Sequence, residues 1–437
     1  MSLTGAMSGS GPLRTRYVAD SGTGLAMNQH LLASILRFQG SSIQHSIGLR
    51  REHQLLLHCA RTEMEEDRIG EVLALLLQGG IDWAYLLECG GRHRVLPLIY
   101  ANFKRHLAER VPADILESLR TCYYTNLVSS IIQSRGLLRI TTLLNASSIP
   151  VLAFKGPTLA ALAYGNTALR QSGDLDLLVR RKDIHEIGRL LHSQGYRSSL
   201  PLPPREEAYF LQHYHEHSFF ADDLRVSLDV HWSLMPPYYT FAMDTDELLQ
   251  RSTTVALDGA AIRTLGPEDL LLFLCLHGSK HRWESLSWIC DIQELINSQL
   301  KIDWERVARD ARRLGLERML ASGLEIARNL LGTRLPDEVP RSLPVDRMTR
   351  ELATEVEVSL FREDRESPVE APCQLSRYFL KSMSQRRDRF LACAQAFMIP
   401  SYYEFLAIHF PTAAFFLYYL FRPMRLAAKY TKGLLPS

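Results

Sequence analysis

VLAFKGPTLAALAYGNTALRQSGDLDLLVRRKD, residues 151–183, places two aspartates one residue apart within an apolar stretch. A charge in a buried strand is costly. Two like charges on one face are worse unless a cation lies between them. Because alternate residues of a strand share a face, Asp174 and Asp176 lie together on one side. The side chains predicted to pack into the core on the other side are Leu175, Leu177 and Val179.

A second apolar stretch, RVSLDVHW at residues 225–232, supplies a third carboxylate. Its alternation places Asp229 and His231 on one face. If this strand lies beside the first, Asp229 joins the two aspartates there. Neighbouring carboxylates suit Mg²⁺ or Mn²⁺. Two such ions would align an attacking hydroxyl with the α-phosphate of a nucleoside triphosphate. The competing interpretation of a D-x-D pair alone is an exposed acidic strand end.

The surrounding pattern predicts an α+β protein. Residues 146–235 read as a strand, a Lys-Gly-Pro turn, a helix, the D-x-D strand, an amphipathic helix over 181–196 and a hairpin over 216–234. This small mixed-sheet core, residues 146–235, is flanked by N- and C-terminal helical regions at 51–145 and 236–335. We expect residues 1–50 to be disordered, 336–375 to be linker-like, and 376–437 to form a helical tail.

Composition is that of an ordinary globular protein, with 46% hydrophobic and 22% charged residues. The net charge of +2 provides no overall field for nucleic acid, which is not an expected partner. The first 30 residues lack the apolar core of a signal peptide, and Met27 is an alternative start. Seven dispersed cysteines without CxxC spacing indicate free thiols in a reducing compartment, so we expect a cytoplasmic location.

The order of these motifs resembles the nucleotidyltransferase superfamily with the polymerase-β-type fold, and most closely its group of uncharacterised bacterial nucleotidyltransferases. The matching residues are Lys155, Gly156, Tyr164, Arg170, Asp174, Asp176, Asp229, His231, Trp232, His277, His281, Trp283, Trp288 and Asp291. The resemblance implies that Asp174, Asp176 and Asp229 are the catalytic residues and the ligands of two Mg²⁺ or Mn²⁺ ions.

The same resemblance implies a nucleotide-binding set at the Lys-Gly turn. Lys155 and Gly156 would lie at the phosphates, and Thr158 would offer its hydroxyl and backbone N–H at a helix start. Ser172 would brace the loop or bind phosphate. Arg170 would be either a phosphate clamp or one half of an ion pair that orders the loop.

One departure concerns this turn, because many members of the superfamily have Gly-Ser where this chain has Lys-Gly-Pro-Thr. The turn, followed by R-x-S-x-D-x-D, resembles abortive-infection-type toxin nucleotidyltransferases. A toxin-like enzyme acting on tRNA is therefore an alternative. The near-zero net charge counts against it, because RNA binding requires a basic patch.

Several histidines and one tryptophan are candidates for the acceptor cleft. His277 and His281 lie four residues apart, so they share a helix face. They either line the cleft with His231 and Trp232 or pack against other tryptophans. A zinc site at this pair lacks the glutamate of a metalloprotease helix and a third ligand.

A second histidine group alternates in HYHEHSFF, at residues 213–220. If this is a strand, His213, His215 and His217 share a face beside Asp229 and His231. They form either a polar strand face bordering the cleft or a zinc cluster.

The predicted function is transfer of a nucleoside monophosphate to an unknown acceptor, which would be a small molecule, a peptide or a glycan intermediate. A non-catalytic nucleotide-binding or scaffold protein on the same fold is the alternative. We expect loss of Asp174 or Asp176 to relieve repulsion and leave the stability of the metal-free protein unchanged or higher.

The C-terminal stretch FFLYYLFRPMRLAAKYTKG, residues 415–433, combines aromatic and basic residues. It would either contact a membrane surface or form a core helix with a solvated basic end. The apolar run at 412–421 has about half the roughly 20 residues that a membrane span needs.

Overall fold

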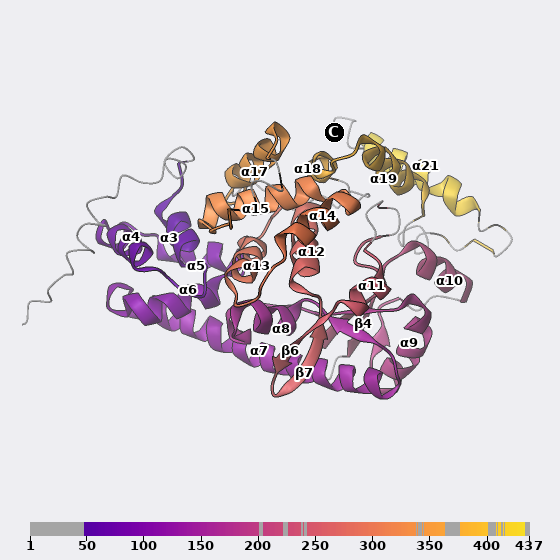
Figure 1. The fold of residues 1–437 in the computed structure, drawn as a ribbon, viewed down its shortest axis with the longest axis horizontal. Helices are drawn as coiled ribbons and strands as arrows, with labels where there is room; N and C mark the ends of the chain where they lie inside the picture. The colour runs from indigo at the N-terminus through magenta and orange to yellow at the C-terminus, as the bar shows by residue number, and fades with distance from the viewer. Residues whose placement is uncertain are drawn as a thin grey trace, which may run out of the picture.

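The computed structural model describes residues 48–200, 204–221, 226–236, 243–337, 345–362, 376–400 and 416–432, with a few single positions between them. The expected disorder of residues 1–50 falls almost entirely outside this part of the chain. The expected α+β class is confirmed, because one small mixed sheet lies within a largely helical protein (Figure 1).

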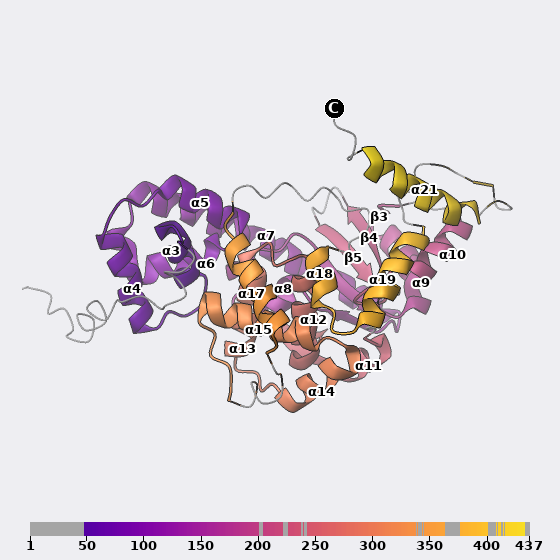
Figure 2. The same ribbon diagram turned by 90° about the horizontal axis from the view of Figure 1, so that it is seen from above.

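The N-terminal helices pack as a group at one end of the molecule (Figure 2). They are α3 (Arg51–Cys59), α4 (Glu66–Leu77), α5 (Trp83–Arg92) and α6 (Leu96–Asn102), followed by the short η1 (Phe103–Leu107) and η2 (Ala108–Arg110). The break between α4 and α5 falls at Gly79 and Gly80, both with positive φ. Glycine reaches this left-handed backbone at little cost, which explains why the helix ends there.

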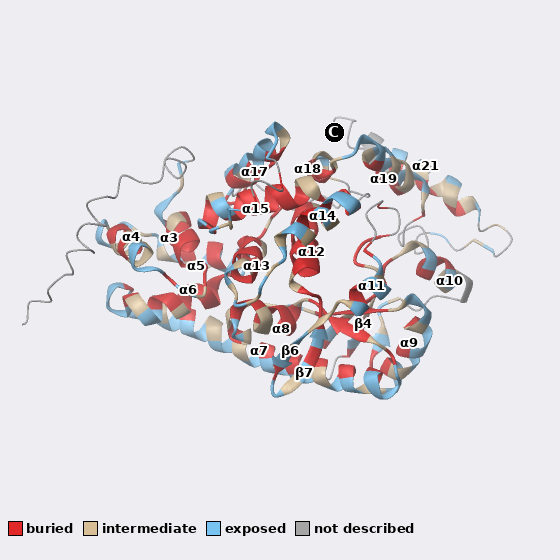
Figure 3. Cartoon of the chain, viewed as in Figure 1, coloured by how far each residue is buried: buried red, intermediate tan, exposed pale blue. Residues whose placement is uncertain are grey.

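A single long helix, α7 (Ala113–Ala146), runs beneath the sheet (Figure 1). Its buried stripe of Leu137, Ile140 and Leu144 joins the core on one face of the sheet. Much of its outer side is exposed along its length (Figure 3). The predicted long helix is therefore confirmed as the support on which the sheet packs.

The sheet has five strands in the order β1-β2-β5-β4-β3. Their bounds are β1 (Val151–Ala153), β2 (Leu175–Val179), β3 (Arg197–Ser198), β4 (Glu216–Ala221) and β5 (Val226–His231). Strands β2 and β5 are parallel, and every other neighbouring pair is antiparallel. The intervening helices are α8 (Gly156–Leu159), η3 (Ala160–Tyr164), η4 (Thr167–Leu169), η5 (Arg181–Asp183), α9 (Ile184–Ser193) and α10 (Pro204–His213).

The two faces of the sheet differ as the alternation of β2 predicts. Leu175, Leu177 and Val179 share a core with α7 and α9. Leu178, on the opposite face, belongs to the larger core formed by the helices at both ends of the chain. The carboxylate face of the sheet is therefore covered by helices rather than left in open solvent.

A two-stranded hairpin was missed in the region expected to be helical from residue 236. Strands β6 (Thr253–Leu257) and β7 (Ala260–Thr264) follow α11 (Thr245–Gln250) and pair antiparallel. Asp258 and Gly259 between them both have positive φ. Asp-Gly between alternating residues is a strong hairpin signal, so this expectation was wrong for a local reason that the sequence contained.

The remaining helices join α3–α6 in the core on the carboxylate side of the sheet. They are α12 (Pro267–Lys280), α13 (Leu286–Asn297), α14 (Trp304–Leu314), α15 (Glu317–Leu331), α17 (Arg347–Ser359) and α18 (Arg377–Ser382). Helix α17 lies in the segment expected to be linker-like, yet it buries Leu352, Ala353 and Val356. Residues 347–359 are therefore a packed element rather than a linker.

Two further helices, α19 (Arg386–Met398) and α21 (Leu417–Lys432), lie at the edge of the molecule (Figure 2). No helix in the described part of the chain is both long and apolar enough to cross a membrane. Six of the seven cysteines are described, and all six are free thiols.

Candidate active site

Two of the three predicted catalytic aspartates lie side by side on neighbouring parallel strands. Asp176 of β2 pairs in register with Asp229 of β5. Asp174 comes immediately before β2 and is half-buried, whereas Asp176 is 3% exposed. The conditional expectation that the second strand lies beside the first is therefore confirmed, and Asp229 joins the D-x-D pair.

Asp176 is held by two cationic or hydrogen-bonding partners. The Lys155 ammonium donates to Asp176 Oδ1 at 2.9 Å, and His231 Nε2 lies 3.1 Å from the same oxygen. The other oxygen, Oδ2, is buried with no hydrogen-bond partner. Lys155 therefore lies with the carboxylates in this structure, whereas the sequence analysis placed it at the phosphates.

The three carboxylates differ in their electrostatics. Burial raises the pKa of Asp174, and the neighbouring Asp176 raises it further. Burial also raises the pKa of Asp229 above its ordinary value. For Asp176, burial alone would raise the pKa, but Lys155 and His231 outweigh it and hold the pKa below its usual range. Asp176 is therefore stabilised as a carboxylate by its partners, whereas burial makes the ionised forms of Asp174 and Asp229 costly.

This result corrects the expected effect of removing Asp176. Its carboxylate balances a buried ammonium, so its removal would leave Lys155 without a counter-ion. Breaking a buried pair by removing one partner is destabilising. The expectation of unchanged or higher stability remains a prediction for Asp174 alone.

The Lys-Gly turn requires glycine. Gly156 has φ +54°, and a Cβ there would lie 3.2 Å from both the Asp174 carbonyl oxygen and Ser172 Oγ. The Ser172 hydroxyl in turn donates to the Asp174 carbonyl oxygen at 3.1 Å. This geometry supports the loop-bracing interpretation of Ser172, and it ties the turn to the start of β2.

The Arg170 guanidinium forms a buried ion pair that reaches across the fold. It donates to Asp291 of α13 through two nitrogens, at 2.7 and 2.9 Å. The Tyr164 hydroxyl donates to the same carboxylate at 2.7 Å. Of the two roles considered for Arg170, the loop-ordering ion pair is the one that this geometry supports.

Thr158 does not present its hydroxyl to a ligand. It is fully buried, and Oγ1 donates to the carbonyl oxygens of Lys155 and Ala153 at 2.7 and 3.1 Å. The expected phosphate contact through this hydroxyl is therefore wrong, because the backbone of the turn already uses it.

The paired histidines of α12 share a face, as predicted. The rings of His277 and His281 lie 4.7 Å apart, and both pack against Trp288 at 5.3 and 5.4 Å between centroids. Burial lowers the pKa of both rings, that of His281 to about 4, and Lys155 lowers each further. Both are therefore neutral at pH 7 and lie within the electrostatic reach of Lys155.

The two tryptophans near these histidines are core residues. Trp232, expected in the cleft, is buried in the core beneath the sheet and packs against Phe210. Trp283 is fully buried, and a Cβ added to Gly278 would lie 2.4 Å from its ring. Trp232 is therefore removed from the cleft set, because its strand position faces the other side of the sheet.

The alternating histidines do not form one strand face. His213 ends α10, and β4 begins only at Glu216. His217 faces away from Asp229 and bonds Ser198 Oγ at 2.7 Å. Only His215 lies near the carboxylate face, so a three-histidine zinc cluster is excluded.

Glu216 is the residue of the site that the sequence analysis missed. It pairs with His231 across the β4–β5 ladder, and its Oε2 lies 3.1 Å from His231 Nδ1. The signal was available in the hairpin. Continuing its pairing outward from the turn brings residue 216 opposite residue 231.

The geometry at Asp176 fits a divalent cation. Ligand atoms of Asp176, Asp229 and His231 all lie within 4.8 Å of one another. A buried carboxylate oxygen without a partner is unusual and requires an explanation. A cation bound by these side chains would provide one, and it would relieve the charge cost at Asp229.

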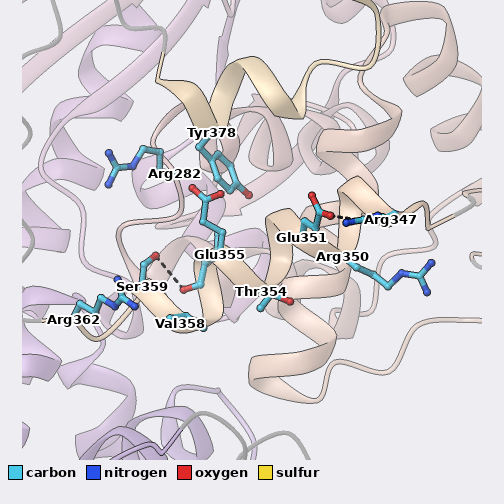
Figure 4. A pocket seen from close by; sticks show the side chains of 11 residues that line it. Arg282, Arg347, Arg350, Glu351, Thr354, Glu355, Val358, Ser359, Arg362 and Tyr378 are labelled. Atoms are coloured by element: carbon cyan, nitrogen blue, oxygen red, sulfur yellow. Dashed lines mark hydrogen bonds and ion pairs between the residues drawn. The ribbon is translucent and has the colours of Figure 1, made fainter.

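A pocket of about 880 Å³ lies elsewhere, between α17, α18 and the turn after α12 (Figure 4). Its lining includes four arginines and two glutamates, of which Arg347 and Glu351 form an ion pair. None of the predicted site residues lines it. In Figure 4 the arginine side chains point in different directions rather than toward one point, so the pocket does not compete with the carboxylates as the candidate active site.

The mixed sheet, with carboxylates on neighbouring parallel strands after a Lys-Gly turn, is the arrangement expected of a nucleotidyltransferase. Residues 79–332, more than half of the chain, match the family described as "Uncharacterised nucleotidyltransferase". The chain belongs to this family, as its motifs indicated.

Comparison with individual proteins adds little. No curated protein matches the chain. The antibiotic-resistance factor ANT(2″)-Ia is 14% identical, with a TM-score of 0.28, over 46% of this chain and 90% of its own. An antigenic nucleotidyltransferase-like protein from Paracoccidioides brasiliensis is 15% identical, with a TM-score of 0.28, over 48% of this chain and 95% of its own. Likenesses this low carry no argument about substrates.

Proposed function

We propose that this chain is a metal-dependent nucleotidyltransferase that moves a nucleoside monophosphate from a nucleoside triphosphate to an acceptor and releases pyrophosphate. The observation that carries the proposal is the parallel register that brings Asp176 level with Asp229, with Asp176 Oδ2 buried and unpartnered. A structural ion pair with Lys155 would not by itself require the second carboxylate.

In this proposal Asp174, Asp176 and Asp229 hold two Mg²⁺ or Mn²⁺ ions. Bound cations of this kind neutralise the triphosphate and align the attacking and leaving oxygens. The acceptor oxygen forms a bond to the α-phosphorus as the bond to the β-phosphate oxygen breaks. Asp229 accepts the proton of the acceptor, as a general base at this position would.

Lys155 has two states in the proposed cycle. Without a cation it neutralises Asp176, and its side chain is 20% exposed. Once the carboxylate is bound to a cation, the ammonium is released and binds the triphosphate beside the Gly156 turn. The long flexible side chain of lysine allows such a movement.

The acceptor side of the cleft is assigned to His231, His277 and His281. The last two are neutral, flat and close to Lys155. The acceptor would be a small molecule, a peptide or a glycan intermediate in the cytoplasm.

Contact with a membrane surface through α21 is a separate part of the proposal. Phe416, Leu420 and Met424 follow one another at four-residue spacing, and each is more than half exposed. Such an apolar stripe is typical of interfacial helices, and the same stretch of sequence carries Arg425, Lys429 and Lys432. Sedimentation with anionic vesicles tests it, and recovery of the wild type in the supernatant would exclude it.

The test of the catalytic proposal uses α-³²P-labelled ATP, GTP, CTP and UTP with Mg²⁺ or Mn²⁺ and a small-molecule cell extract as the source of acceptor. We expect metal-dependent label transfer with one nucleotide, lost in EDTA and in Asp229→Asn. Nucleotide-dependent stabilisation of the protein without pyrophosphate release would instead favour the non-catalytic binder.

A further inference from the structure

His231 occupies a special position at the end of β5. It is 5% exposed and lies between two carboxylates from neighbouring strands. Nε2 is 3.1 Å from Asp176 Oδ1, and Nδ1 is 3.1 Å from Glu216 Oε2. The ring therefore lies between the two carboxylates, with a hydrogen bond at Nε2 alone.

This pattern is the one in which proteins hold a metal-binding histidine. Such a histidine usually donates its second ring N–H to a carboxylate, which fixes the tautomer and the ring orientation. In this structure Nδ1 lies within ion-pair distance of Glu216 without a hydrogen bond. With a cation bound, Nδ1 would donate to Glu216 and the Nε2 lone pair would be on the side of Asp176. Ligand atoms of His231, Asp176 and Asp229 lie within 4.8 Å of one another, and Asp176 Oδ2 has no partner.

We propose that His231 Nε2 is itself a ligand of the cation held by Asp176 and Asp229, with Glu216 as the residue that orients it. The inference rests on the proposed function and refines it. The centre then offers nitrogen as well as oxygen, so it prefers a first-row transition ion such as Mn²⁺ to Mg²⁺.

The selectivity follows from the chemistry of the two ions. Mg²⁺ takes oxygen ligands, demands near-ideal octahedral geometry and gives up water reluctantly. Imidazole nitrogen favours transition ions, whose affinities rise along the series that begins with Mn²⁺. Replacing a water or carboxylate oxygen by Nε2 therefore weakens the binding of Mg²⁺ more than the binding of Mn²⁺.

Two other arrangements of the same residues must be distinguished. In the first, His231 only donates a hydrogen bond to Asp176. In the second, the cation lies on the Nδ1 side, among His215, Glu216 and His231, which also lie within 4.8 Å of one another. The second is disfavoured because a cation there would leave the buried Asp176 Oδ2 without a partner and would meet the Lys280 ammonium, which acts on Glu216.

The experiment is pulsed electron paramagnetic resonance of Mn²⁺ bound to the full-length protein, with calorimetric titration of Mn²⁺ and Mg²⁺. We expect a ¹⁴N coupling from one directly bound imidazole. Selective ¹⁵N-histidine labelling of the wild type should replace this ¹⁴N coupling by a ¹⁵N coupling. The wild-type measurement needs no variant, so it stands even if a substitution at this buried position impairs folding.

Four variants then locate the nitrogen. His215→Gln should keep the coupling. His231→Gln should abolish the coupling and lower the Mn²⁺-to-Mg²⁺ affinity ratio by at least tenfold. Glu216→Gln should keep the coupling but weaken Mn²⁺ binding about 10- to 100-fold, as loss of an orienting partner does. His217→Gln, on the opposite face of the same hairpin, is the matched control and should change neither.

The outcomes separate this inference from the proposed function. Binding of Mn²⁺ without nitrogen coupling, or coupling that persists in His231→Gln, overturns the inference and leaves the carboxylate centre standing. Coupling that is lost in His215→Gln as well as in His231→Gln would place the cation on the Nδ1 side, which also overturns it. Failure of both ions to bind overturns the inference and the proposed function together.

Discussion

Asp176 should respond to substitution by asparagine differently from Asp174 and Asp229 in the metal-free protein. Asp176→Asn removes the carboxylate that balances Lys155, whose ammonium is 2.9 Å away. The side chains are 2% and 20% exposed, so solvent cannot replace the lost partner. Breaking a buried pair costs about 3–5 kcal/mol. Because asparagine keeps one oxygen as an acceptor, we expect the free energy of unfolding to fall by about 3 kcal/mol.

Asp174→Asn is the matched control, two positions earlier and just before the strand. Burial raises the pKa of Asp174, so its ionised form costs stability at neutral pH. Removing this charge should leave the free energy of unfolding unchanged or higher. Asp229→Asn should behave like Asp174→Asn, because its pKa is raised for the same first cause.

The pH dependence gives a second check on the sign. The pKa of Asp176 lies lower in the folded than in the unfolded state, so its stabilising contribution is present above about pH 4 and is lost as the pH falls below that value. The difference in the free energy of unfolding between the wild type and Asp176→Asn should therefore become smaller below about pH 4.

Urea denaturation in EDTA, followed by circular dichroism at several pH values, measures both effects. If Asp176→Asn is as stable as the wild type at pH 7, the stabilising role of the Asp176–Lys155 pair is refuted. It is also refuted if Asp174→Asn is destabilised by as much as Asp176→Asn, because repulsion and pairing would then not distinguish the two aspartates.

The remaining predictions concern Gly156 of the turn, Lys155 and the Arg170–Asp291 ion pair. Gly156→Ala forces a Cβ into the left-handed region and should cost about 1–2 kcal/mol, measured by melting temperature against Gly173→Ala, whose Cβ meets nothing within 4 Å. Lys155→Met should weaken nucleoside triphosphate binding in calorimetry while leaving Mn²⁺ affinity unchanged or higher; weaker metal binding would contradict its role as a displaced counter-ion. Arg170→Lys cannot reproduce the two-nitrogen contact with Asp291. It should therefore lower the stability of the protein and its metal affinity together. Unchanged metal affinity would show that the Arg170–Asp291 ion pair does not support the metal site.

The sequence by itself determined the local geometry of the site. The period of two in LDLLV and in VSLDVH fixed which side chains share a strand face, and both faces are as predicted. The spacing of four in α12 likewise placed His277 beside His281. These relations depend only on the backbone period of one element, so they can be read without knowing its neighbours.

Only the tertiary structure decided how these elements meet. Arg170 finds Asp291 across 121 residues, and Lys155 finds Asp176 rather than open solvent. Glu216 is part of the site because the pairing of β4 with β5 places it directly opposite His231. Such pairings are set by the packing of whole helices and strands against shared cores, and a buried charge accepts whichever partner that packing brings within reach.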